Sequence, residues 1–200
     1  MGTVCAAAAY DQGLLRRVSV AVAIWGMSYA LYRGYYAVGG TGFLPGRPAD
    51  LAQFRLINAA GAAILTFAAV LPIAILPLWR RLRAQTVLLV LCWMIAVGCC
   101  VHALVDSIQR VLSLTGRLRI DYPTSAWVTI DHRAADLQDL FFNEPWFLLE
   151  GLGFAALGWI ILGPGSRRRG WAVSAVAATF ALTVVGLLSA TGVIGKVIIG

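Results

Sequence analysis

The 200-residue sequence contains little charge, since only 12% of its residues are Asp, Glu, Lys or Arg and 60% are hydrophobic. A soluble domain has about 25% charged and about 45–50% apolar residues. The composition therefore excludes an ordinary soluble domain and predicts an integral membrane protein. The net charge of +7 does not indicate nucleic-acid binding, because the basic residues lie between apolar runs and leave no separate basic face.

The chain also lacks the motifs of several enzyme classes. No serine lies in a G-x-S-x-G context, no H-E-x-x-H sequence occurs, and the four cysteines form no C-x-x-C motif. The adjacent Cys99 and Cys100 are either a redox pair or small packing residues, and we favour packing. His102, Asp106 and Glu150 could together bind a metal, but no repeated His spacing supports this. We therefore expect neither a metal nor another cofactor.

Long apolar runs predict five membrane-spanning helices, because about 20 residues cross the hydrocarbon core of a bilayer. These segments are 18–38, 56–78, 86–108, 145–162 and 171–194. The first has no cleavage site after it, which indicates a membrane helix rather than a cleaved signal. The connections are too short for another domain, so we expect one all-α bundle over 1–200. The longest connection, 110–143, should contain a short amphipathic helix that Asp131 caps.

The charged residues are distributed unequally between the two sides of the predicted bundle. Arginines 16–17, 80, 81, 83 and 167–169 all fall on the side of the N-terminus. Under the positive-inside rule this side is cytoplasmic, which places the N-terminus inside and the C-terminus outside. The opposite side carries eight of the nine acids. We therefore look for chemistry in the outward half of the bundle.

Two groups of polar residues fall within the outward half of the predicted helices. His102 and Asp106 are four residues apart on one helix face and can together move protons near neutral pH. Their alternative role is a simple pair at the headgroup level. Glu150 lies about 7 to 8 Å inside its helix. A carboxyl group in an apolar pocket can stay protonated at neutral pH, as a general acid must. The alternative for Glu150 is a structural ion pair with Arg33 or Arg110.

Other candidates lie at the start of the same helix and along the first one. Pro145 fits a first helical turn, so Asn143 and Glu144 are interpreted mainly as helix caps, with Glu144 kept as a catalytic candidate. An aromatic stripe in the first helix either anchors that helix at the membrane interface or stabilises a cation. The candidate substrate contacts are Trp25, Tyr29, Tyr32, Arg33, Tyr36, Asn58, Asn143, Trp146 and Phe147.

A histidine followed one turn later by an acid, with a glutamate on a later membrane helix, resembles the emopamil-binding/EXPERA group. That group includes sterol double-bond isomerases and sterol-binding relatives. The matching positions are His102, Asp106 and Glu150, although Asp106 replaces the usual glutamate. The combination of intramembrane acids and aromatic residues is also similar to the membrane-bound terpene cyclases of meroterpenoid pathways. Both resemblances imply that an alkene or epoxide is protonated, the carbocation is held among aromatic rings, and a proton is removed elsewhere.

The leading hypothesis is a cofactor-independent isomerase or cyclase acting on an isoprenoid or sterol-like lipid in the bacterial plasma membrane. Glu150 would donate the proton, and Asp106 with His102 would accept or relay it. The rival hypothesis is a non-enzymatic protein, namely a lipid-binding protein, a small transporter or a subunit of a membrane complex. Its charges would form ion pairs or a proton path. A transporter of this size would have to dimerise, so a homo-oligomer is among the expectations.

Overall fold

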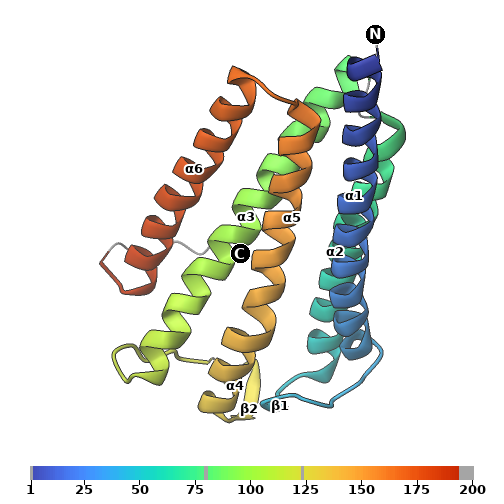
Figure 1. Cartoon of the computed structure of the whole chain (residues 1–200). Coiled ribbons are helices and arrows are strands. Elements are labelled where there is room, and N and C mark those ends of the chain that lie inside the picture. The colour runs from blue at the N-terminus through green and yellow to red at the C-terminus, as the bar shows by residue number, and fades with distance from the viewer. Residues whose placement is uncertain (1, 79–80, 123, 194–200) are drawn as a thin grey trace.

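The computed structural model describes residues 2–78, 81–122 and 124–193, and five long helices dominate it (Figure 1). Each contains a stretch long and apolar enough to cross a membrane, which confirms the predicted all-α bundle. The long helices are α1 (Gly2–Ala37), α2 (Leu51–Leu78), α3 (Leu82–Leu114), α5 (Glu144–Leu162) and α6 (Ser166–Ala190).

The helices run alternately up and down, so their connections gather at two ends (Figure 1). The start of α1, the α2–α3 connection and the α5–α6 connection lie at one end, as the arginine pattern predicts for the cytoplasmic side. α1 begins earlier than predicted, and α3 extends to Leu114 rather than to residue 108. α6 ends at Ala190, and the predicted end at residue 194 lies outside the described residues.

A short antiparallel ribbon joins the two connections at the opposite end. β1 (Gly46–Pro48) pairs with β2 (Trp127–Ile130), with Gly46 opposite Ile130. A side chain at Gly46 would collide with the carbonyl oxygen of Thr129, so this position requires glycine. The ribbon ties the α1–α2 hairpin to the segment before α4, and the apolar-run analysis did not predict it.

α5 begins at Glu144, one residue before the predicted start at Pro145, but the break and the helix cap expected there are absent from this described segment. Asp131 does cap α4 (His132–Gln138), since its side chain accepts a hydrogen bond from the backbone N–H of Ala134 at 3.0 Å. α4 then continues through a π-helical turn, η1 (Asp139–Asn143), into α5 without a break. The wider turn accommodates Pro145, whose ring would collide with the carbonyl four residues earlier in a regular helix. Asn143 and Glu144 are therefore interior helix residues and not caps.

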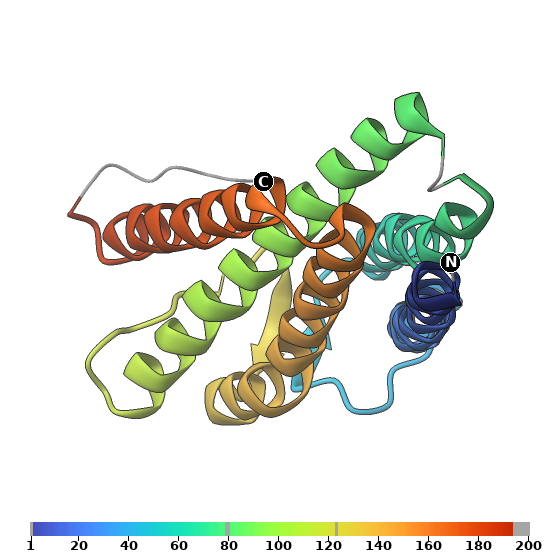
Figure 2. The same ribbon diagram turned by 45° about the horizontal axis from the view of Figure 1, so that its top comes forward.

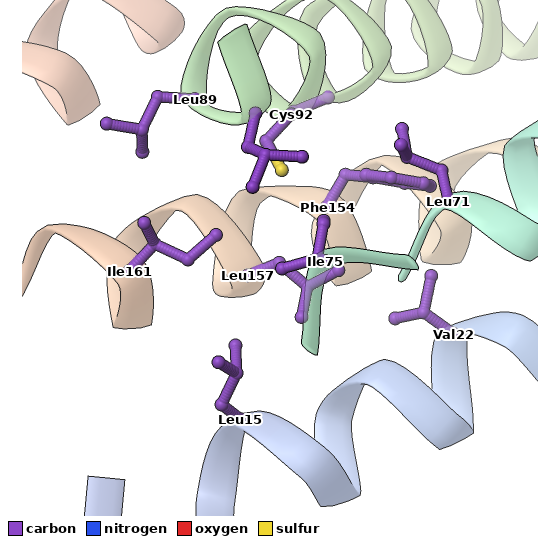
Figure 3. Packing of buried hydrophobic residues seen from close by; sticks show 11 residues of the cluster. Leu15, Val22, Leu71, Ile75, Leu89, Cys92, Phe154, Leu157 and Ile161 are labelled. Carbon is purple, nitrogen blue, oxygen red and sulfur yellow. The ribbon is translucent and has the colours of Figure 1, made fainter. Parts of the chain in front are cut away.

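The helices pack as two connected groups (Figure 2). α1 lies along α2, α3 packs against both α5 and α6, and α1 joins the groups by packing on α5. α2 and α3 barely touch. The apolar core lies in the half nearer the arginine-rich end, where side chains of α1, α2, α3 and α5 interdigitate (Figure 3). In a bilayer such close packing, rather than removal from water, holds helices together.

Candidate functional site

Three side chains meet between α3 and α5 in the half of the bundle away from the arginine-rich end. His102 Nε2 lies 3.8 Å from Asp106 Oδ2 and 3.8 Å from Glu144 Oε2. Both separations exceed hydrogen-bond distance. Glu144 is only 3% exposed, and its Oε2 has no hydrogen-bond partner within the described part of the chain. The three ligand atoms all lie within 4.8 Å of one another, so this group could hold a metal ion, with Glu144 rather than Glu150 as the second carboxylate.

A second polar network lies beside this cluster and fixes α4 to α3. The Arg110 guanidinium is 3.2 Å from Asp136 and 2.8 Å from Asp139. Ser113 donates a hydrogen bond to Asp136 at 2.5 Å, and Arg110 donates one to the Tyr122 hydroxyl at 2.7 Å. Burial raises the pKa of Tyr122 to about 12, so its hydroxyl stays protonated at neutral pH.

This network removes Arg110 as a partner for Glu150. Within the described residues, no salt bridge joins Glu150 to Arg33 or to Arg110. Glu150 is 7% exposed, and neither of its carboxyl oxygens has a hydrogen-bond partner in the described chain. A Cβ at Gly26 would lie 2.9 Å from Glu150 Oε1. Glycine at this position therefore lets the carboxyl group approach the backbone of α1 closely.

The aromatic stripe of α1 faces α5 and η1. The Trp25 and Trp146 rings stack with centroids 4.1 Å apart, and Tyr29 stacks on Trp146 at 5.3 Å. The Tyr29 hydroxyl donates to the Asn143 side-chain oxygen at 3.2 Å. Because Tyr29 is buried, an interfacial belt does not account for it. The stripe packs inward and forms one wall of the space around Glu150.

Two adjoining cavities lie between the α1–α2 pair and the α3–α5 pair. The outer cavity, about 420 Å³, is lined by Arg33, Asp106, Glu144 and their polar neighbours. The inner cavity, about 240 Å³, is almost wholly apolar apart from Glu150 at its wall. Both cavities share the side chains of Tyr29, Ile64, Leu65 and Phe147. The shared walls make them two compartments of one space, which is polar toward the end away from the arginines and apolar deeper in the bundle.

A further hollow of about 460 Å³ lies between α3 and α6. His102 and Asp106 line this hollow as well as the outer cavity, so they face both spaces. The His102 side chain is 46% exposed, and its ring packs edge to face with that of Phe147, with the ring centroids 4.3 Å apart. Gly98 lies deeper in α3, where it borders both this hollow and the inner cavity.

The structure brings most of the predicted site residues together, with three departures. Asn58 is buried and donates a hydrogen bond to the Phe54 carbonyl at 2.8 Å, and it lines neither cavity. Tyr36 also lines neither cavity; its hydroxyl donates to the Gly42 carbonyl at 3.0 Å and lies 3.0 Å from the Tyr32 hydroxyl. Tyr32 is the third departure: it lines neither cavity, and its hydroxyl accepts a hydrogen bond from the Gln138 side chain at 2.9 Å.

Sequence reasoning missed several residues of the site. Gly26 carries no chemical signal, and its role depends on the packing of α1 against α5. Ile64 and Leu65 read as ordinary membrane-facing residues until α2 is placed beside the cavities. Cys99 lines the inner cavity, and Cys92, Cys99 and Cys100 are free thiols.

Comparison with protein-family models, with curated proteins and with solved structures finds no match to this chain. The fold and the site alone therefore define the class, which is a five-helix membrane protein with a polar-to-apolar internal space.

Proposed function

We propose that this protein is a membrane-embedded acid/base isomerase or cyclase acting on an isoprenoid or sterol-like lipid. The observation that carries the proposal is the Glu150 carboxyl group, which is buried at the wall of an aromatic-lined cavity and has neither a salt bridge nor a hydrogen-bond partner among the described residues. An isolated buried carboxyl group is held at lowest cost in its neutral form. That form carries the proton that an acid catalyst needs.

The walls of the inner cavity suit a carbocation. Trp25, Tyr29, Trp146 and Phe147 surround the space next to Glu150. Aromatic faces attract a cation by about 0.5 to 2 kcal/mol each when water is excluded. The apolar lining also keeps water from capturing the cation. These features support protonation of an alkene rather than hydrolysis.

The candidate proton acceptor is the His102–Asp106 pair, which lines the outer cavity. Glu144, which faces His102, precedes Glu150 by six residues on α5, a rise of about 9 Å. A shift of one double bond needs the donor and the acceptor within a few atoms of each other. A separation of this size instead suits a linear isoprenoid that is protonated at one alkene and deprotonated several carbons away, so it favours ring closure.

The proposed reaction is balanced without a co-reactant. The Glu150 O–H proton forms a C–H bond as the alkene π electrons leave the neighbouring carbon cationic. A second alkene of the same chain attacks that carbon and closes a ring. A C–H proton then passes to the His102–Asp106 pair as a new C=C bond forms. Proton return to Glu150 restores the enzyme, and the product is an isomer of the substrate.

The proposed location is the bacterial plasma membrane, with the cavities in its outward half. The Arg119→Cys variant should react at that position with a membrane-impermeant maleimide on whole cells. The Arg167→Cys variant should react at its new position only after lysis. Arg119 lies in the connection between α3 and β2, and Arg167 lies in the first turn of α6, at the opposite end of the bundle. The reverse labelling pattern would contradict this orientation.

Turnover in D₂O tests the reaction directly. Purified protein in lipid nanodiscs, given farnesol or geranylgeraniol, should form an isomeric product that carries one deuterium on carbon. Glu150→Gln should lower the rate by at least about 100-fold, because a general acid contributes about 10²–10⁴-fold. Asp121→Asn, which changes an exposed acid, is the matched control and should retain the rate.

Two results would overturn the assignment. If Glu150→Gln keeps the wild-type rate, Glu150 is not the donor. If the linear isoprenoids bind tightly but emerge unchanged and without deuterium, the rival role of a lipid-binding protein replaces the enzyme.

A further inference from the structure

We propose that His102, Asp106 and Glu144 form a binding site for one divalent first-row transition-metal ion, a departure from the expectation of no metal. The donor set consists of one imidazole nitrogen and two carboxylates from facing helices, with all three ligand atoms within 4.8 Å of one another. The binding itself does not depend on the proposed reaction.

The distances fit ligands that surround a common centre. Ligands about 2.0–2.2 Å from a metal ion lie roughly 3.0–3.5 Å from each other in tetrahedral or octahedral geometry. His102 Nε2 is 3.8 Å from both partner oxygens, slightly wider than a loaded site and too wide for hydrogen bonds. A small side-chain rotation closes this difference, since two of the ligands lie one turn apart on α3.

Glu144 supplies an independent sign that a ligand belongs here. Its side chain is 4% exposed, and its Oε2 faces His102 without a hydrogen-bond partner in the described chain. Leaving a buried carboxylate oxygen without a partner destabilises the folded protein. A cation bound to this oxygen would remove that cost. Sequence analysis attributed Glu144 to helix capping, which the continuous helix excludes.

The surrounding charges favour a divalent cation. The cluster and its neighbours together carry four carboxylates (Asp106, Asp136, Asp139 and Glu144) and two guanidinium groups (Arg33 and Arg110). Four negative charges less two positive charges leave two negative charges when all are ionised. Arg110 is already paired with Asp136 and Asp139 and does not neutralise Glu144. One divalent cation therefore balances the group.

The donor types indicate which ions fit. Imidazole suits zinc and iron, whereas carboxylates also suit manganese, so a mixed set favours Zn²⁺, Fe²⁺ or Mn²⁺ over Mg²⁺ or Ca²⁺. Three protein ligands leave coordination positions open, as in catalytic zinc sites. If the proposed cyclisation holds, an ion held by His102, Asp106 and Glu144 would supply a basic site at the position where the His102–Asp106 pair accepts the substrate proton.

Metal binding is tested on the full-length protein in detergent, stripped with chelator and titrated with Zn²⁺ by calorimetry. We expect one ion per chain. His102→Gln and Glu144→Gln should each weaken the affinity by at least about 10- to 100-fold. The other histidine, His132, lies at the start of α4 outside the cluster and provides the matched control, since His132→Gln should bind as wild type.

X-ray absorption of the zinc-loaded wild-type protein keeps the test independent of variant folding. The spectrum should show nitrogen and oxygen ligands and no sulfur. Failure of the wild type to bind, sulfur ligands from the cysteines, or equal loss of affinity in His132→Gln would overturn the metal site. Those results would leave the deuterium test of the proposed reaction unaffected, so the two proposals fail separately.

Discussion

The two halves of the bundle fill the space between their helices in different ways. Toward the arginine-rich end, Leu15, Ile75, Phe154 and Leu157 are completely buried and leave little room among α1, α2 and α5. Toward the opposite end, the corresponding space holds two adjoining cavities and three buried carboxyl groups, those of Asp136, Glu144 and Glu150. The half at the arginine-rich end thus holds the helices together, whereas the opposite half bears costly polar groups.

This difference separates stability from chemistry along the same helices. Phe154 and Glu150 are one turn apart on α5, and both are buried. Phe154 packs within the apolar cluster, whereas the Glu150 carboxyl group borders a cavity and has no hydrogen-bond partner in the described residues. Substitutions in the two halves should therefore have separable effects on unfolding and on turnover.

The largest effect on stability is expected in the packed half. Phe154→Ala leaves a cavity among α1, α2, α3 and α5 and should lower the free energy of unfolding by about 3–5 kcal/mol. Unfolding by SDS in mixed micelles measures this change. Phe180→Ala on the exposed face of α6 is the control and should change the free energy of unfolding by no more than about 0.5 kcal/mol. Equal effects of the two substitutions would contradict the placement of the apolar core in the half at the arginine-rich end.

A smaller and more local effect is expected for the polar network that holds α4. Arg110→Gln leaves Asp136 and Asp139 without their cation and should cost about 2–4 kcal/mol. Hydrogen exchange should accelerate in α4 and in residues 115–122 and 124–131, while the core part of α3 stays protected. Arg119→Gln breaks only an exposed pair and should leave exchange unchanged. Uniform acceleration through α3 would contradict a local role.

A subtler effect is expected where α1 approaches Glu150. A methyl group at residue 26 would meet Glu150 Oε1 and the Ala69 side chain, so Gly26→Ala should displace the carboxyl group and reduce turnover about 10- to 100-fold. Gly34→Ala on the same helix meets nothing within 4 Å and should leave turnover unchanged. Wild-type turnover in Gly26→Ala would show that the position of Glu150 does not limit the rate.

The sequence predicts the membrane helices well because each span carries its own apolar signal. It also singles out His102, Asp106 and Glu150, which the structure places at cavity walls, since charges within apolar runs are conspicuous. It fails at Glu144, because a glutamate before proline has the same local pattern at a helix start and within a π-helical turn. Only the continuation of α4 into α5 distinguishes the two cases, and that depends on tertiary contacts of Asp136 and Asp139 with Arg110.

Gly98 offers the most direct test of the claim that the outward half holds a lipid. It borders the inner cavity, and a Cβ at this position meets nothing within 4 Å, so Gly98→Leu should fill the space without disturbing the backbone. Gly34→Leu, on α1 and equally open at its Cβ, is the control. Lipid extraction and mass spectrometry should find about one isoprenoid-like lipid per chain in the wild type and in Gly34→Leu, and almost none in Gly98→Leu. The same bulk phospholipids in all three proteins would contradict the account.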